Sequence, residues 1–166
     1  MGQSGFKKQM AQHEHWMNEA IALAVENVRS GRGGPFGAVV TRNDELIATG
    51  TNLVTAINDP TAHAEIVAIR ASCRALSTFQ LAGCEIYSSC EPCPMCVAAI
   101  YWARPAGYYF ASTRGDAAAA GFDDAFIDTQ LGLPTDDRSI RSHHVLTANS
   151  LAPFVEWARS TSKIQY

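Results

Sequence analysis

The sequence predicts an α/β domain in which helices cover a β-sheet, and three observations support this prediction. Stretches with helical periodicity alternate with short β-type runs in the order helix, strand, strand, helix, strand, helix, strand. The chain has 166 residues, enough for one domain with a sizeable core. Hydrophobic residues make up 47% of the chain and charged residues 17%, which is typical of a soluble globular protein.

The expected first helix spans 12–29, where apolar residues recur at spacings of four, four and three: Met17, Ile21, Val25 and Val28. The polar residues before it are expected to fray. The glycine-rich stretch 30–35 ends the helix. Two strands follow at 36–41 and 45–50, and a turn at 43–44 joins them as a β-hairpin.

A second helix is expected after Thr61, which is a plausible N-cap. His63 and Glu65 would then lie in its first turn. The rest of this helix carries a core-facing stripe of apolar residues at spacings of three, four and three: Ile66, Ile69, Cys73 and Leu76. Both polar side chains therefore belong to the start of an amphipathic helix.

A third strand is expected at 84–88, followed by a third helix. Pro94 suits the first position of that helix, which makes Cys93 its cap. Pro105 disfavours helical geometry in the residue before it, so the helix should end near Arg104. A fourth strand is expected at 107–111, and after an alanine-rich stretch at 116–121 a short helix is expected at 122–126. A polar, turn-rich stretch at 132–141 leads to a last short strand at 142–146. Residues 151–158 lead into a closing helix that ends near Tyr166.

Two short motifs, at 61–65 and 90–96, together offer the ligands of a zinc ion. The first contains His63 and the second contains Cys93 and Cys96, with 27 residues between Glu65 and Cys93. Two thiolates and one imidazole leave the fourth tetrahedral position open for water. The starts of helices favour thiolate over thiol, which is the form that binds metal. Glu65, two residues from His63, is suitably placed to move that water's proton.

A closed structural zinc site is the alternative that the spacing leaves open. Cys90 could join the other three ligands in a Cys₃His set, which would belong to a non-catalytic interaction domain. Against this, Cys90 precedes a Glu-Pro pair at the expected end of a strand, and Glu65 would have no role beside a saturated metal. The remaining cysteines, Cys73 and Cys84, are best interpreted as small core residues.

His-x-Glu followed by Pro-Cys-x-x-Cys is the pattern of zinc nucleobase deaminases, and the chain resembles the cytidine-deaminase-like superfamily over nearly its whole length. The resemblance implies a three-layer α/β/α fold with a central mixed five-stranded sheet. It also implies one zinc ion per subunit, with a bound water or hydroxide, on His63, Cys93 and Cys96. Glu65 would be the catalytic acid and base.

Further segments resemble the bacterial guanine deaminases: 33–39, 58–65, 91–96, 99–104, 119–124 and the closing Tyr166. This resemblance implies hydrolysis of guanine to xanthine and ammonia, in purine catabolism or salvage, with related aminotriazines as further substrates. In that family the C-terminal segment crosses to the other subunit. The resemblance therefore implies a homodimer in which roughly 147–166 is swapped.

The same resemblance implies a set of substrate-binding residues: Asn52, Phe36, Ala64, Trp102, Asp124 and Tyr166. Asn52 would meet the purine edge and Phe36 the ring, while Asp124 would act near the leaving amine as a second catalytic group. Phe36 and Trp102 could equally be core residues. Asp123 and Asp124 cannot be separated from the sequence, and either could cap a helix.

The closest rivals in substrate are tRNA adenosine deaminase and cytosine deaminase, which share the zinc motifs. A tRNA enzyme needs basic residues for its polyanionic partner. Here the formal net charge is −3, and Arg159 and Lys163 are the only cations in 156–166. A small purine, rather than a nucleic acid, is the expected partner.

The chain is expected to work in the cytoplasm, away from membranes. No apolar run has the length of a membrane span, and the first residues lack the apolar centre of a signal peptide. Five cysteines, an odd number that includes a Cys-x-x-Cys pair, suit a metal in a reducing compartment better than a set of disulfides.

Overall fold

A computed structural model describes residues 3–165 of the chain and the side chains of 5–165. The chain divides into two compact units, Met1–Ala125 and Phe126–Tyr166. Among the described residues, no helix combines the length and the apolar character that crossing a membrane requires.

The first unit contains the predicted alternation of helices and strands. Its elements are α1 (Gln3–Arg29), β1 (Gly37–Arg42), β2 (Glu45–Thr51), α2 (Val54–Ile57), α3 (Ala64–Ala75), β3 (Cys84–Cys90), α4 (Pro94–Ala103), β4 (Gly107–Ser112) and α5 (Arg114–Ala119). The next helix, α6 (Ala125–Gly132), begins at Ala125, the last residue of the first unit.

The four strands form one mixed sheet in the order β2-β1-β3-β4. β1 pairs antiparallel with both β2 and β3, and β3 pairs parallel with β4. The predicted hairpin turn is confirmed, because Asn43 and Asp44 have φ of 52° and 64°, the left-handed geometry that a two-residue hairpin loop requires. A mixed sheet of this kind brings the ends of β3 and β4 to the same edge.

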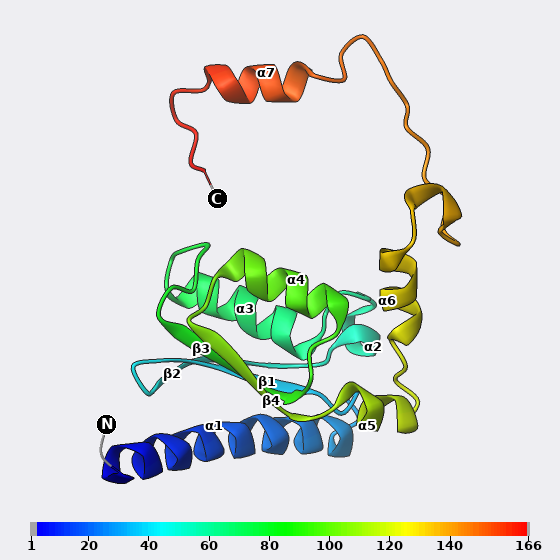
Figure 1. Ribbon diagram of the computed structural model, residues 1–166. Coiled ribbons are helices and arrows are strands. Elements are labelled where there is room, and N and C mark those ends of the chain that lie inside the picture. The colour runs from blue at the N-terminus through cyan, green and yellow to red at the C-terminus, as the bar shows by residue number, and fades with distance from the viewer. Residues whose placement is uncertain (1–2, 166) are drawn as a thin grey trace. The chain divides into compact units, whose positions relative to one another are not determined.

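Helices cover both faces of the sheet, with α1 on one side and α3 and α4 on the other (Figure 1). The larger buried cluster lies between the sheet and α3 and α4, and includes Val40, Leu81, Ile86 and Ile100. The smaller one joins Ala20 of α1 to Val39 and Tyr87 of the sheet. The three-layer α/β/α prediction is therefore confirmed.

Small residues let both helical layers approach the sheet closely. A Cβ atom on Gly50 of β2 would lie 2.1 Å from the backbone oxygen of Ala64 in α3, and one on Gly37 would lie 2.3 Å from that of Ala20 in α1. The buried face of α1 consequently carries Ala20 and Ala24. The larger Val25, on the predicted stripe, is 42% exposed.

The second unit holds the rest of α6, a 3₁₀ turn (Thr135–Asp137) and α7 (Ala152–Arg159). None of its described residues is buried. Several of its large apolar side chains are more than half exposed, among them Leu131, Ile140, Leu146, Leu151 and Phe154. Apolar surface of this extent is typical of a segment that packs against a partner.

The expected fifth strand is wrong. Residues 142–146 have no regular structure, and the sheet of the described chain has four strands. A strand exists only where a neighbour completes its ladder of hydrogen bonds, and local composition does not reveal that neighbour. The closing helix also ends earlier than expected, at Arg159.

Three helix starts differ from the expectation. The first helix begins at Gln3, so the polar residues before 12 continue it, and the short helix α2 interrupts the expected loop. Thr61 is not the cap of α3, because His63 occupies that position. The Thr61 hydroxyl instead donates to Asp59 Oδ1 at 2.7 Å, which closes a turn ahead of the helix.

We expect Gly50→Ala to lower the free energy of unfolding by about 3 kcal/mol or more, at the upper end for overpacked cores. The added methyl would meet the backbone of Ala64 and Ala68, which cannot rotate away. Thermal denaturation measures the loss. Gly115→Ala is the matched control: its Cβ would meet only Thr113 Oγ1, at 3.5 Å within a helix, and it should be neutral or stabilising. Equal melting temperatures for the two variants would contradict the packing argument.

Candidate active site

The residues predicted as zinc ligands lie at the starts of two helices on the same side of the sheet. His63 directly precedes α3 and Cys93 directly precedes α4, both in extended backbone geometry, and neither side chain caps its helix. Cys96 is buried in the first turn of α4. The local sequence therefore leaves the imidazole and both sulfurs available for another partner.

The three ligand atoms have the spacing of a tetrahedral zinc site. His63 Nδ1 lies 3.5 Å from Cys93 Sγ and 3.6 Å from Cys96 Sγ. Zinc bond lengths with a tetrahedral angle place such a nitrogen and sulfur about 3.6 Å apart. All three atoms lie within 4.8 Å of one another. Among the described residues, these three side chains form the one group of three or more potential ligands that could hold a metal ion. The donor set therefore fits zinc.

The electrostatics of this group also favour a metal. The Cys96 thiol beside it and its contact with His63 lower the pKa of Cys93 to about 4. In the opposite direction, the Cys93 thiolate raises the pKa of Cys96. Two sulfurs that share one proton in this way offer a divalent cation a ready site, because the cation can replace that proton and stabilise both thiolates.

Glu65 lies beside the ligands in the first turn of α3 and is buried. Its Oε1 accepts a hydrogen bond from Ser88 Oγ at 3.1 Å, and its Oε2 accepts one from Cys96 Sγ at 3.4 Å. Burial raises the pKa of this carboxyl above its usual range. A carboxyl that is held in place and poised toward the neutral form can both accept and return a proton.

Cys90 does not join the zinc ligands. Its thiol donates to the Thr113 carbonyl oxygen at 3.4 Å, and burial raises the pKa of the thiol, which disfavours a thiolate. In the described part of the chain, Cys90 is not one of the three side chains whose ligand atoms lie close enough to share a metal ion. The arrangement therefore leaves one coordination position open, as in a catalytic site.

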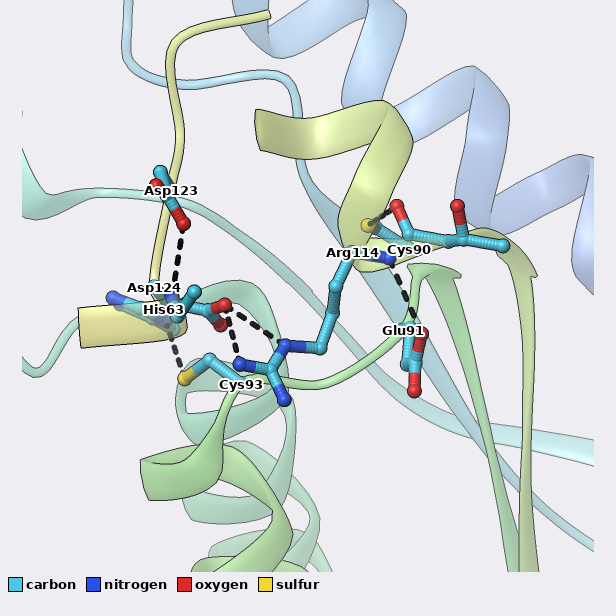
Figure 2. A network of polar contacts seen from close by, with 9 residues as sticks. His63, Cys90, Glu91, Cys93, Arg114, Asp123 and Asp124 are labelled. Atoms are coloured by element: carbon cyan, nitrogen blue, oxygen red, sulfur yellow. Dashed lines mark hydrogen bonds and ion pairs between the residues drawn. The ribbon is translucent and has the colours of Figure 1, made fainter. Parts of the chain in front are cut away.

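A cavity of about 360 Å³ opens beside the zinc ligands, within the usual size range of small-molecule sites. His63, Glu65 and Cys93 form one part of its lining. Three of the predicted substrate-binding residues, Phe36, Asn52 and Asp124, also line the cavity. Asp123, the neighbour of Asp124, lines it as well. Figure 2 shows two contacts at this wall, Asp124 with Arg114 and His63 with Cys93.

The cavity walls combine aromatic and polar groups. Phe36 and Phe122 meet edge to face with ring centroids 5.1 Å apart. Asn52 is buried, and its Oδ1 accepts from the Val54 backbone N–H at 3.3 Å. Asp123 Oδ1 accepts from the Ala125 backbone N–H at 2.9 Å, so this aspartate caps a turn.

Of the predicted substrate-binding residues that the structure describes, Trp102 and Ala64 are not part of the cavity lining. Trp102 lies on α4 with 63% of its surface exposed. Tyr166 lies outside the described residues. Ala64 is fully buried, directly after His63. Their substrate contacts stay predictions.

Sequence reasoning missed two residues of this site, Ser88 and Arg114. Ser88 lies on β3 and bonds the Glu65 carboxylate across the core. Arg114 lines the cavity and bonds Asp124, ten residues later in the chain. Neither belongs to a motif with a fixed spacing, because each contact depends on how separate segments meet in space.

Comparison with known proteins places this geometry in a family. Residues 10–112 match the family model described as the cytidine and deoxycytidylate deaminase zinc-binding region. A guanine deaminase from Bacillus subtilis is 48% identical over 154 residues, which cover 93% of this chain and 99% of that protein. The X-ray structure of guanine deaminase from B. subtilis aligns with a TM-score of 0.91 over 93% of this chain and 98% of that one.

Other relatives are more distant. A structure of guanine deaminase from Nitrosomonas europaea aligns with a TM-score of 0.62 at 30% identity, covering 78% of this chain and 66% of that one. A tRNA-specific adenosine deaminase from Agrobacterium fabrum is 39% identical over 116 residues, 68% of this chain and 74% of that protein. The chain belongs to the zinc-binding cytidine and deoxycytidylate deaminase family, hydrolases of carbon–nitrogen bonds, and within that family it groups with the guanine deaminases.

Proposed function

We propose that the chain hydrolyses guanine to xanthine and ammonia, with zinc as its cofactor. The observation that carries this proposal is the buried carboxylate of Glu65 next to an open three-ligand zinc set, at the wall of a cavity lined by aromatic and amide side chains. Similarity to a guanine deaminase over nearly the full length of both chains supports the choice of guanine. The tRNA-specific relative matches a smaller share of the chain.

In this proposal the protein's own groups move the protons. Zinc, when bound, supplies a Lewis acid that lowers the pKa of a water molecule toward ~7. Glu65 accepts a proton from the attacking water and passes it to a ring nitrogen of guanine. C2 can then accept the water oxygen without negative charge building up on the ring. Glu65 then takes the proton of the new C2 hydroxyl and passes it, directly or through Asp124, to the amine. The C2–N bond breaks, ammonia leaves and C2 becomes the carbonyl carbon of xanthine.

The lining of the cavity supports roles in substrate binding. Asn52 offers an amide to the edge of the purine, and Phe36 offers an aromatic face or edge to its ring. We assign the role at the leaving amine to Asp124, because it lines the cavity and Asp123 already bonds the backbone of Ala125. The roles expected of Ala64, Trp102 and Tyr166 belong to the same proposal.

We also propose a swapped homodimer, in which roughly 147–166 of one subunit covers the site of the other and Tyr166 closes the partner's pocket. The exposed apolar side chains of the second unit support this, because Leu151 and Phe154 are each about 70% exposed. A cytoplasmic location stays part of the proposal.

The substrate assignment predicts ammonia release from guanine by the purified, zinc-loaded protein. An enzyme-coupled assay measures ammonia release from guanine and, in separate reactions, from adenine, cytosine, guanosine and an aminotriazine. Guanine should be the preferred substrate by kcat/KM. Turnover of cytosine without turnover of guanine would overturn the substrate and leave the chemistry intact.

Glu65→Gln is the matched variant for the chemistry, since it keeps the shape of the side chain and removes its proton-accepting oxygen. It should keep zinc while kcat falls at least ~10²–10⁴-fold, the usual range for general acid–base catalysis. Zinc content is measured by atomic emission. A variant that retains most of its turnover would show that another group moves the proton.

The open site predicts that Cys90→Ser keeps stoichiometric zinc, because this thiol bonds the Thr113 carbonyl oxygen instead of the metal group. Cys96→Ser, the matched control within the ligand set, should lose most of the zinc. Metal analysis after dialysis against a weak chelator measures both variants. Loss of zinc from Cys90→Ser alone would favour a closed structural site and a non-catalytic domain.

The swapped dimer predicts complementation between two inactive variants. Glu65→Gln keeps the Tyr166 tail, and Tyr166→Ala keeps the proton-moving site. Co-expression with two affinity tags isolates the heterodimer. If the tail crosses over, one pocket of the heterodimer has both intact parts, and activity returns to about half that of the wild type. A heterodimer as inactive as both parents would contradict the swap, and a monomeric mass in light scattering would contradict the dimer.

A further inference from the structure

We propose that Arg114 is a positioning residue for the deamination step, because it fixes the Asp124 carboxylate at the cavity wall. The inference rests on the proposed function, in which Asp124 meets the leaving amine. Arg114 Nε donates to Asp124 Oδ1 at 2.8 Å and an Nη donates to the same oxygen at 2.6 Å. Both residues line the cavity beside the zinc ligands (Figure 2).

The direction of these bonds leaves a defined role for the second carboxylate oxygen. Two N–H groups of one guanidinium converge on Oδ1, so that oxygen is anchored. Oδ2 receives neither of these bonds, so we infer that it is the oxygen that meets a ligand in the cavity. A planar guanidinium holds its donors in a rigid fork, so it restricts the carboxylate's rotation more than a lysine would.

Arg114 can act as an anchor because its own backbone is tied to the zinc-ligand loop. Its backbone N–H donates to Glu91 Oε2 at 3.2 Å, and the Glu91 backbone N–H donates to the Ser112 carbonyl at 2.8 Å. The Cys90 thiol holds the intervening Thr113 carbonyl. The loop that leads to Cys93 and the start of α5 therefore form one connected piece, which carries the guanidinium.

Asp124 lies outside any helix or strand, between Gly121, which has a φ of 93°, and α6. Its neighbours have contacts of their own, Phe122 against Phe36 and Asp123 on the Ala125 backbone N–H. The Arg114 pair is a contact of the Asp124 side chain itself, and it connects that carboxylate to the loop of the zinc ligands. A shift of about 1 Å at a reacting group can cost on the order of 10²-fold in rate.

The pair lies at the cavity wall, where the side chains of Arg114 and Asp124 are 27% and 23% exposed. Water can therefore reach either group when its partner is removed, and loss of the pair should destabilise the fold only modestly. A large effect on turnover with only a small effect on folding is therefore the expected mark of positioning.

The test is a double-mutant cycle with Arg114→Met and Asp124→Asn in the full-length, zinc-loaded protein. Arg114→Met should lower kcat about 10–100-fold, leave KM nearly unchanged, keep its zinc and have a melting temperature close to that of the wild type. In the Asp124→Asn background the same change should cost less than about twofold, because the carboxylate to be positioned is gone. Arg114→Lys, which keeps the charge without the fork, should recover only part of the rate.

Arg70→Met is the matched control, since Arg70 pairs with Asp59 at 3.6 Å outside the cavity lining, and it should behave like the wild type. The inference would be overturned if the two losses in kcat multiplied in the double mutant. It would also be overturned if Arg114→Met raised KM and left kcat unchanged. Crystal structures of wild type and Arg114→Met give a readout independent of substrate: the Asp124 carboxylate should move or lose density. An unmoved carboxylate would also overturn the inference. Failure of the proposed function would appear separately, as wild-type protein that releases no ammonia from guanine.

Discussion

The site depends on one constraint: the starts of α3 and α4 must meet so that an imidazole and two sulfurs share a single centre. His63 and Cys93 occupy the cap positions of these helices without capping them. Gly50 makes the meeting possible, because it lets α3 rest directly on the backbone of β2. This packing sets the spacing of about 3.5 Å between the ligand atoms, because His63 and Cys93 directly precede the two helices.

The same packing gives each remaining group its chemical character. Burial against the sheet raises the pKa of Glu65, while a hydrogen bond from Ser88 holds one of its oxygens in place. The Cys90 thiol bonds a carbonyl on the α5 side and stays out of the metal group. Three ligands, one open position and a proton carrier beside it thus result from how α3 and α4, two helices of one layer, pack on the sheet.

Much of this could be predicted from the sequence where the signal is local. The hairpin, the three main helices, the zinc ligands and the Cys93 cap follow from periodicity, proline placement and fixed spacing. The expected fifth strand at 142–146 failed because strand formation needs a partner that composition does not name. The cap of α3 was misplaced because the Thr61 hydroxyl closes a turn with Asp59 instead. Arg114 was invisible because its pairing with Asp124 exists only in three dimensions.

The backbone contacts at Gly37 and Gly50 bear on how such a protein can change over evolutionary time. At both positions a helix touches the sheet through main-chain atoms, so no neighbouring side chain can shrink to accommodate a larger residue. A larger residue at either position would have to move a whole helix, and at Gly50 that helix begins directly after the ligand His63. The cavity residues in 52–55 and 114–124 are not part of these backbone contacts. A change in the cavity lining there does not have to move the helix that positions the metal ligand.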